Sequence, residues 1–338
     1  MSESHSTYLA RLYHVFTSFF LLGFTSFGGP AAHLGYFNQE FIKTKKWATE
    51  SQYAQWVALS QVVPGPGSSQ VGFALGYHRA GIFGGLAAFI GFTLPSFVAM
   101  VLLAIFGEVW QGNYLFEGVI HGLKLLAVVV VADACVSMWR SFCKTKTMAL
   151  VALVGAAAII LLPVPFITLI VLVFAVLFGF IKNIGIVPDH ESLPNVSFAK
   201  GVFLLAVLLF MACFMFHEGL LGLFSDFYFA GTLVFGGGHV VLPMLSTFVS
   251  GSVSDADLLL GYAAAQAVPG PMFTMASFLG ASAAPENANV WLWAGMGTLA
   301  VFLPGLMLML CAQNAWQKLS SHVRFRSVVT SLNAAVVG

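Results

Sequence analysis

Charge is scarce in this sequence. Only 8% of its 338 residues are charged, whereas soluble domains carry roughly 25%. The formal net charge is +1, so the chain has no surplus of basic residues to neutralise the phosphates of a nucleic acid. These two deficits exclude a soluble globular domain and indicate that the chain has no nucleic-acid partner.

Cysteine pairs and cofactor ligands are also missing. The four cysteines are scattered and show no Cys-x-x-Cys spacing, so they predict neither a disulfide framework nor a metal site; they are Cys135, Cys143, Cys213 and Cys311. No ligand spacing typical of haem, flavin or an iron–sulfur cluster occurs. We therefore expect no cofactor and no bound metal, and we predict that the protein is not an enzyme.

Apolar runs take the place of charge. Hydrophobic residues make up 59% of the chain and the mean hydropathy is +0.91. A membrane-spanning helix needs about 20 apolar residues, and long apolar runs occur at residues 12–27, 81–106, 116–139, 148–162, 166–181, 198–216 and 220–235. Residues 1–7 show no cleavable signal pattern, so the first run should remain in the membrane. The composition predicts an all-α integral membrane protein, a polytopic helical bundle in a lipid bilayer.

One helix-breaking motif occurs twice. Gln-Val-Val-Pro-Gly-Pro at residues 61–66 returns as Gln-Ala-Val-Pro-Gly-Pro at residues 266–271. Such a break leaves backbone groups unpaired, which lipid cannot satisfy, so it must be buried in protein or line a wet cavity. The flanking runs 50–63 and 65–77 would each reach roughly 21 Å as helix, too short to cross. Each Pro-Gly-Pro segment is therefore the predicted tip of a re-entrant helical hairpin.

Matching landmarks indicate two repeats. Phe27 and Phe235, Pro64 and Pro269, Pro95 and Pro304, and Leu123 and Leu332 lie 205 to 209 residues apart. Loops that are basic in one half are acidic at the corresponding place in the other. Since cytoplasmic loops carry excess Lys and Arg, the two repeats should have inverted topology.

The predicted organisation has three parts. Residues 1–182 form the first transmembrane repeat, residues 183–197 a cytoplasmic linker, and residues 198–338 the second, inverted repeat. Nothing after the linker matches residues 148–181, so we expect the second repeat to lack its last helices. Span count and loop charge together predict a multi-pass protein of the cytoplasmic (inner) membrane with its N-terminus in the cytoplasm.

Four motifs in combination resemble a known family. They are Phe-Gly-Gly-Pro-Ala-Ala-His at residues 27–33, the two Pro-Gly-Pro motifs, and Phe-Gly-Gly-Gly-His at residues 235–239. Together they resemble the chromate transporter family, and the chain is similar to a fused two-repeat member. The resemblance implies export of chromate from the cytoplasm, resistance to the metal oxyanion, and the proton-motive force as energy source.

Matching breaks in two halves are typical of a transport site. A proline favours the first position of a helix, and the free amides that follow can bind an anion with help from the helix dipole. Two tips entering from opposite faces would suit a tetrahedral dianion. Lys124, in an apolar run, could neutralise part of its charge. The predicted substrate-binding residues are Gln61, Pro64, Gly65, Pro66, Gly67, Ser68, Ser69, Lys124, Gln266, Pro269, Gly270, Pro271 and Asn333.

Four residues are candidates for coupling protons to transport. His33 and His239 lie near the glycine-rich breaks, and histidine titrates near neutral pH. Glu40 and Asp133 are the acidic alternatives. For each, a purely structural hydrogen bond or ion pair is the competing interpretation, just as the Pro-Gly-Pro segments could serve only close helix packing.

Several functional alternatives remain open at this point. The transported ion could be sulfate or another oxyanion, for which chromate is a mimic, because size and charge barely differ. A passive anion channel would need the same site but no coupling. The sequence leaves open whether the chain forms a homodimer.

Overall fold

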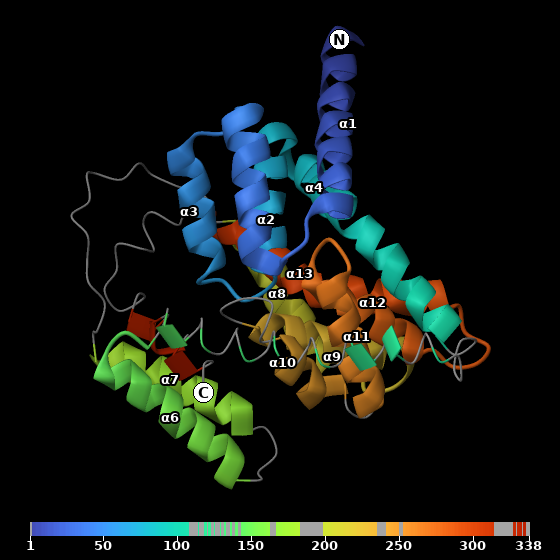
Figure 1. The fold of residues 1–338 in the computed structure, drawn as a ribbon. Coiled ribbons are helices and arrows are strands. Elements are labelled where there is room, and N and C mark those ends of the chain that lie inside the picture. Colours follow the sequence, from blue (N-terminus) through green and yellow to red (C-terminus); the bar gives the residue numbers. More distant parts are fainter. Residues whose placement is uncertain are drawn as a thin grey trace. The chain divides into compact units, whose positions relative to one another are not determined.

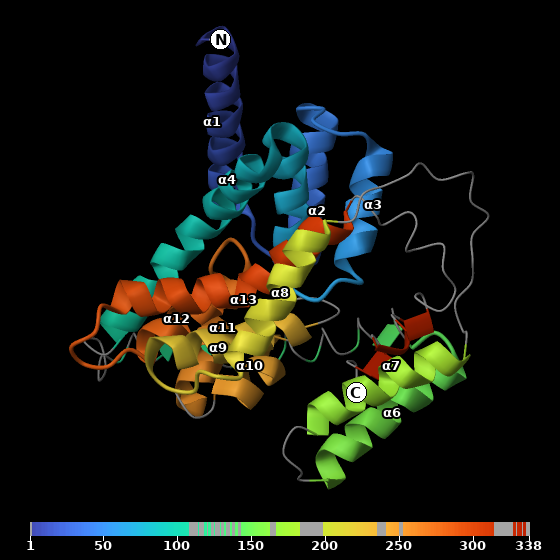
Figure 2. The same cartoon turned by 180° about the vertical axis from the view of Figure 1, so that it is seen from behind.

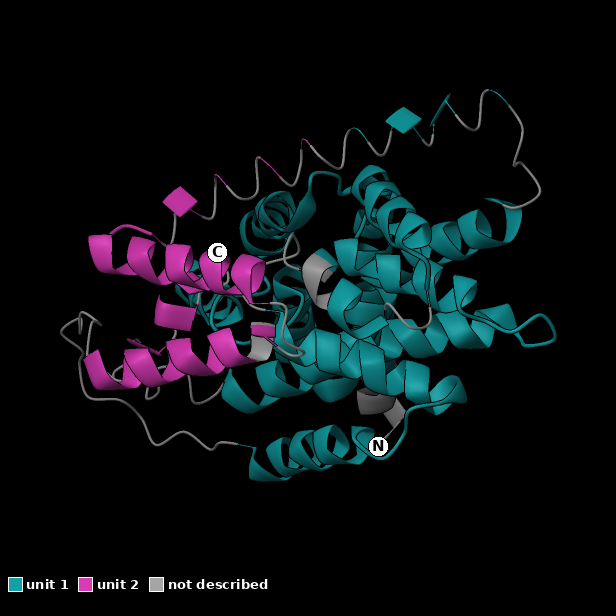
Figure 3. Cartoon of the chain, turned by 90° about the horizontal axis from the view of Figure 1, so that it is seen from below, with its two compact units in different colours: residues 1–128, 199–313 teal, residues 129–198, 314–338 magenta. Residues whose placement is uncertain are grey.

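The computed structural model describes residues 2–107, 143–162, 167–182, 199–234, 241–249 and 253–313, together with single residues between 114 and 140 and between 327 and 335. Every regular element in this part of the chain is helical, as the composition predicts. The chain divides into two compact units, residues 1–128 with 199–313 and residues 129–198 with 314–338 (Figure 3). Each unit is described by itself.

The first unit combines helices from both sides of the predicted linker (Figures 1 and 2). Before the linker it contains α1 (Ser2–Thr25), α2 (Gly29–Phe37), the π-helix η1 (Asn38–Thr44), α3 (Glu50–Ser60) and α4 (Gly67–Gly107). After the linker it contains α8 (Lys200–Cys213), α9 (Gly219–Leu233), α10 (Val241–Val249), α11 (Asp255–Ala267), the 3₁₀ turn η3 (Met272–Thr274), α12 (Met275–Ser282) and α13 (Val290–Ala312).

Short helices flank the first Pro-Gly-Pro segment as expected. The N-terminus of α3 is fixed by a capping box, in which Thr49 accepts from the Gln52 amide at 3.2 Å and the Gln52 side chain accepts from the Thr49 amide at 3.0 Å. After the tip, α4 is broken at Ala80 and Gly81, where Gly81 has φ +65°. The helix that follows the tip therefore covers residues 67–79, and a second, longer helix continues to Gly107.

Two helices in the described part of the chain, α4 and α13, are long and apolar enough to cross a membrane. Large apolar side chains also lie on outer surfaces, among them Leu21 at 66% exposure. Many exposed large apolar side chains in one chain suit contact with lipid.

The second unit contains a helical pair, α6 (Lys146–Leu161) and α7 (Ile167–Lys182) (Figure 3). The predicted pair over residues 148–162 and 166–181 is thus present. Its outward side chains are strongly apolar, with Ile160 80% and Ile181 74% exposed. A Cβ atom at Gly179 would lie 2.6 Å from the backbone of Ser327 and of Val328, so a glycine lets the C-terminal segment approach α7 closely.

In the first unit, two close helix crossings at glycine match each other, one from each half of the sequence. A Cβ atom at Gly23 of α1 would lie 2.8 Å from the carbonyl oxygen of Phe92 in α4, and one at Gly231 of α9 would clash with the carbonyl of Val301 in α13. Both glycines and both carbonyls occupy corresponding places in the two halves of the sequence. Backbones that approach this closely leave no room for a side chain.

Substituting Gly231 by alanine should therefore push α9 away from α13. We expect a loss of stability of about 1–3 kcal/mol, the usual range for overpacking a close contact, measured as a lowered thermal unfolding midpoint in detergent. The matched control is Gly201→Ala in α8, where no atom lies within 4 Å of the added Cβ. Equal unfolding midpoints for the two variants would contradict the close crossing.

Candidate functional site

The glycine and the second proline of each Pro-Gly-Pro tip are buried, and the two tips are held in the same way. Gly65 and Gly270 have φ +123° and +106°, backbone conformations that favour glycine. The Gly65 amide donates to the carbonyl of Val234 at 2.7 Å, and the Gly270 amide donates to the carbonyl of Ser26 at 2.9 Å. Ser26 directly precedes the first glycine-rich break and Val234 the second, so each tip is bound to the chain just before the break of the other half.

The packing of the tips also joins each tip to the other half of the sequence. A Cβ atom at Gly65 would lie 2.7 Å from the Cα atom of Gly305, and one at Gly270 would lie 2.7 Å from the Oγ atom of Ser96. Gly305 follows Pro304 inside α13, and Ser96 follows Pro95 inside α4. Each tip therefore lies against the proline-containing helix of the other half of the sequence.

Free amides follow the first tip. The first intrahelical bond of α4 runs from the Gln70 amide to the Pro66 carbonyl at 3.0 Å. Because the opening amides of an α-helix have no intrahelical acceptor, the amides of Gly67, Ser68 and Ser69 are the orphan donors at this end. The helix begins one residue later than predicted, at Gly67 and not at Pro66.

The second tip departs from the sequence prediction. The chain after Pro271 begins as the 3₁₀ turn η3, in which the Thr274 amide donates to the Pro271 carbonyl at 3.0 Å. A regular α-helix beginning after Pro271 would leave the amides of Met272, Phe273 and Thr274 free, but the tighter i to i+3 turn uses the Thr274 amide. Among the described residues, two amides remain without an acceptor at this tip, against three at the first.

His33 lies between the two tips. Its ring is 1% exposed and packs edge-to-face on Phe92, with the ring centroids 5.1 Å apart. Nδ1 is 3.3 Å from the Oγ atom of Ser68, in the first turn of α4, and Nε2 is 3.2 Å from the carbonyl oxygen of Ser26. That carbonyl also accepts from Gly270, so one imidazole ring and one carbonyl group separate Ser68 from the second tip.

Gln70 is a contact residue that the sequence analysis does not single out. Its side chain is fully buried, and Nε2 donates to the Pro64 carbonyl at 2.9 Å and to the Gly305 carbonyl at 3.1 Å. Because both partners can only accept, the orientation of the amide is settled. A lone amide side chain one turn after a Pro-Gly-Pro tip was the available signal in the sequence.

Several buried polar atoms around the tips have no hydrogen-bond partner among the described residues. They are the hydroxyl groups of Ser26, Ser69 and Thr93, Oε1 of Gln70 and Nε2 of Gln266. Buried polar groups are normally paired, and exceptions point to a bound water, ion or ligand. Gln61, the partner of Gln266 in the sequence repeat, is half-buried at the C-terminus of α3.

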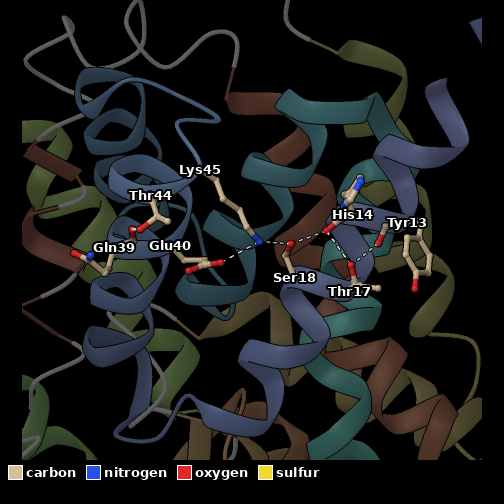
Figure 4. A network of polar contacts seen from close by, with 8 residues as sticks. All are labelled: Tyr13, His14, Thr17, Ser18, Gln39, Glu40, Thr44 and Lys45. Carbon is tan, nitrogen blue, oxygen red and sulfur yellow. Dashed lines mark hydrogen bonds and ion pairs between the residues drawn. The ribbon is translucent and has the colours of Figure 1, made fainter.

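Glu40 lies apart from the tips, in a surface network (Figure 4). Its carboxylate pairs with Lys45 at 2.9 Å, and the two side chains are 36% and 33% exposed. Lys45 also donates to Ser18 at 2.5 Å and lies over the ring of Trp47. The remaining predicted residues, Lys124, Asp133, His239 and Asn333, lie outside the described part of the chain.

Replacing Glu40 with glutamine should leave transport nearly unchanged. A solvent-exposed ion pair contributes about 0–1 kcal/mol, so for the chromate transport that the sequence motifs imply we expect a flux within about twofold of wild type and an unchanged response to a proton gradient. Flux into inverted membrane vesicles measures both. If Glu40→Gln abolished the response to the gradient, Glu40 and not a buried group would be the proton carrier.

Apolar helices with exposed apolar side chains, and broken helices whose tips are buried, define a helical membrane protein. A family model described as "Chromate transporter" matches residues 13–180 and 221–338. The chain therefore belongs to the chromate transporter family, which is a family of membrane transporters and not of enzymes. The resemblance seen in the sequence motifs is confirmed.

Individual relatives agree with this assignment. The chain is 26% identical over 335 residues to an uncharacterized transporter of Methanocaldococcus jannaschii, covering 96% of this chain and 81% of the relative. It is 27% identical to a probable chromate transport protein of Synechococcus elongatus, covering 95% and 81%. A chromate transport protein of Pseudomonas aeruginosa is 25% identical, covering 96% and 78%. No solved structure matches the chain.

Proposed function

We propose that this protein is a secondary active transporter that exports chromate across the cytoplasmic membrane. The oxyanion binds near mid-membrane, between the two Pro-Gly-Pro tips. In this proposal the protein is a multi-pass protein of the inner membrane with a cytoplasmic N-terminus. Family membership and the names of the relatives support chromate as the substrate, and the geometry of the tips supports the location of the site.

The observation that carries the proposal is the reciprocal pair of hydrogen bonds, from Gly65 to Val234 and from Gly270 to Ser26. Equivalent donors reach equivalent acceptors in the opposite half, as expected for two repeats related by a pseudo-two-fold axis. The paired glycine crossings support the same symmetry. Transporters built from inverted repeats place their substrate site at the repeat interface, on broken helices. Residues 1–182 and 198–338 are then the two repeats and residues 183–197 the linker.

The binding chemistry follows from what each tip offers. The free amides of Gly67, Ser68 and Ser69 and the dipole of α4 attract negative charge, and Met272 and Phe273 contribute the amides of the second tip. Nε2 of Gln266 is a buried donor without a partner among the described residues. Gln61, Lys124 and Asn333 complete the proposed set. His33, His239 and Asp133 are the proposed proton-coupling residues.

Two other functions would use the same site. A transporter whose natural substrate is sulfate would bind chromate as a mimic, because both are tetrahedral dianions. A passive anion channel would conduct either ion but could not move it against a gradient. Purified protein in proteoliposomes separates the three, with chromate and sulfate uptake measured with and without an imposed proton gradient.

Chromate accumulation that requires the proton gradient and exceeds sulfate accumulation is the expected result. Greater accumulation of sulfate than of chromate would identify sulfate as the natural substrate and overturn chromate as the substrate. Flux that only follows the anion gradient would identify a channel and overturn active export.

A further inference from the structure

His33 is placed to control the hydroxyl group of Ser68. The imidazole contacts two polar groups, the Oγ atom of Ser68 at 3.3 Å and the carbonyl oxygen of Ser26 at 3.2 Å. Ser68 is 4% exposed and His33 1% exposed. Neither contact is therefore shared with bulk solvent, and the hydrogen atoms in this short chain of contacts can be assigned.

The Ser26 carbonyl determines the tautomer of the ring. A carbonyl oxygen can only accept, so Nε2 of His33 must carry a hydrogen. A neutral imidazole has a single N–H group, which leaves Nδ1 as an acceptor. The hydroxyl of Ser68 must therefore donate its hydrogen to Nδ1. In this state Ser68 presents only lone pairs to any anion at the start of α4.

Addition of a proton to His33 reverses the contact with Ser68. The proton is taken up at Nδ1, which then donates to Ser68 Oγ, while the Nε2–H group keeps its bond to the Ser26 carbonyl. The hydroxyl hydrogen of Ser68 then becomes free to donate to an anion bound at the free amides of α4. The imidazolium also adds a positive charge beside the same helix end.

We propose that the His33–Ser68 pair is a proton-controlled switch of oxyanion affinity, in which protonation of His33 releases the Ser68 hydroxyl to bind the anion. This inference rests on the proposed oxyanion site at the tips. It assigns Ser68 a direct contact with the anion and His33 a positioning role, and it links one proton to the affinity of the site.

Among the described residues, no charged side chain makes a hydrogen bond or ring contact with the imidazole of His33. Its described contacts come from Ser26, from Ser68 and Phe92 of α4, and from no titratable side chain. The helices around α2 are α1, η1, α3 and α4. Tyr53 is the buried titratable group on them, and its hydroxyl donates to the Leu34 carbonyl. The other charged and titratable groups on these helices are exposed or half-exposed; they include Arg11, His14, Glu40, Lys43, Glu50, His78 and Arg79. Among the described residues, His33 is therefore the group at the proposed site through which pH should change the affinity for chromate; His239 and Asp133 lie outside the described part of the chain.

Equilibrium binding of chromate to purified protein tests the switch. Affinity is measured between about pH 4 and pH 8 for wild type, Ser68→Ala, Ser68→Thr and His33→Gln. Glutamine can donate to the Ser26 carbonyl and accept from Ser68, so it imitates the neutral ring at every pH. Chromate itself takes up protons in this range, but the ratio of wild-type to variant affinity at each pH removes that contribution.

The expected result is a wild-type affinity that exceeds those of Ser68→Ala and His33→Gln by about tenfold at low pH, the usual effect of one hydrogen bond to a charged group. The ratio should fall toward one at high pH. Ser68→Thr, which keeps the hydroxyl, should restore the wild-type response. Ser225→Ala serves as a control, since that buried hydroxyl donates to the Leu221 carbonyl of its own helix at 2.9 Å.

Two outcomes would count against the proposal in different ways. A wild-type pH response retained in Ser68→Ala would overturn the switch and leave the proposed transport function intact. Wild-type protein that binds no chromate at any pH would overturn the proposed site and the switch together. If His33→Gln does not fold, the comparison of Ser68→Ala with Ser68→Thr decides alone.

Discussion

Gly65→Ala should abolish chromate uptake while Gly295→Ala has little effect. Alanine at residue 65 must adopt φ +123°, which strains the backbone by about 1–3 kcal/mol. Its Cβ atom would also lie 2.7 Å from the Cα atom of Gly305. The backbone of α13 cannot rotate away as a side chain can, so the tip must leave its position. We expect a drop in uptake of at least tenfold, on the order of 1.4 kcal/mol or more at the site.

The second tip should be more tolerant of the same change. At Gly270 the added Cβ would meet the Oγ atom of Ser96, which is the end of a side chain and can rotate. Gly270→Ala should therefore impair uptake less than Gly65→Ala does. Gly295, in α13, is the control because no atom lies within 4 Å of its added Cβ. Uptake in proteoliposomes, together with size-exclusion profiles that show folded protein, measures all three.

Wild-type uptake by a well-folded Gly65→Ala protein would contradict the binding role of the tip. It would favour the simpler interpretation, that Pro-Gly-Pro serves only close packing of helices. A larger loss in Gly270→Ala than in Gly65→Ala would contradict the steric ranking but not the presence of a site.

Gln70→Leu should lower both stability and transport. The substitution removes the donor shared by the Pro64 and Gly305 carbonyls, and an unpaired buried acceptor costs about 1–3 kcal/mol. Leucine fills a similar volume, so loss of the hydrogen bonds is the main change. Since Pro64 belongs to the first tip, the tip is released from α13. We expect a lower thermal unfolding midpoint and uptake reduced by about tenfold or more.

Gln313→Leu is the matched control for this prediction. Gln313 directly follows α13, and its buried Nε2 atom has no hydrogen-bond partner among the described residues. Removing an unpaired amide should be neutral or slightly stabilising. A Gln70→Leu protein as stable and active as Gln313→Leu would show that the bonds from Gln70 do not hold the tip.

Local features of the sequence were enough to predict the class and the helix breaks. Low charge and long apolar runs identify a helical membrane protein, because lipid accepts only internally satisfied backbone. Pro-Gly-Pro ends a helix wherever it occurs, so the short helices beside both tips could be predicted. The resemblance of the motifs to the chromate transporter family is likewise carried by residues close together in the sequence.

The prediction for the second tip was wrong because the residues after a proline can adopt two local geometries. A proline can begin an α-helix or precede a 3₁₀ turn, and at Pro271 the chain takes the turn, which uses the Thr274 amide. Glu40, a candidate proton carrier, forms a contact that could not be predicted from the sequence. Its ion pair with Lys45 on a partly exposed surface depends on a π-helical turn that no sequence pattern predicted.

By itself the sequence determined that this chain is a helical membrane protein with two broken helical segments, because composition and helix-breaking residues act over a few neighbouring positions. Only the tertiary structure decided which acceptors the tips reach. Gly65 donates to Val234, and Gln70 to Gly305, across gaps of well over a hundred residues. An unpaired amide can be satisfied by any carbonyl within reach, and the packing of distant helices selects the one that is there.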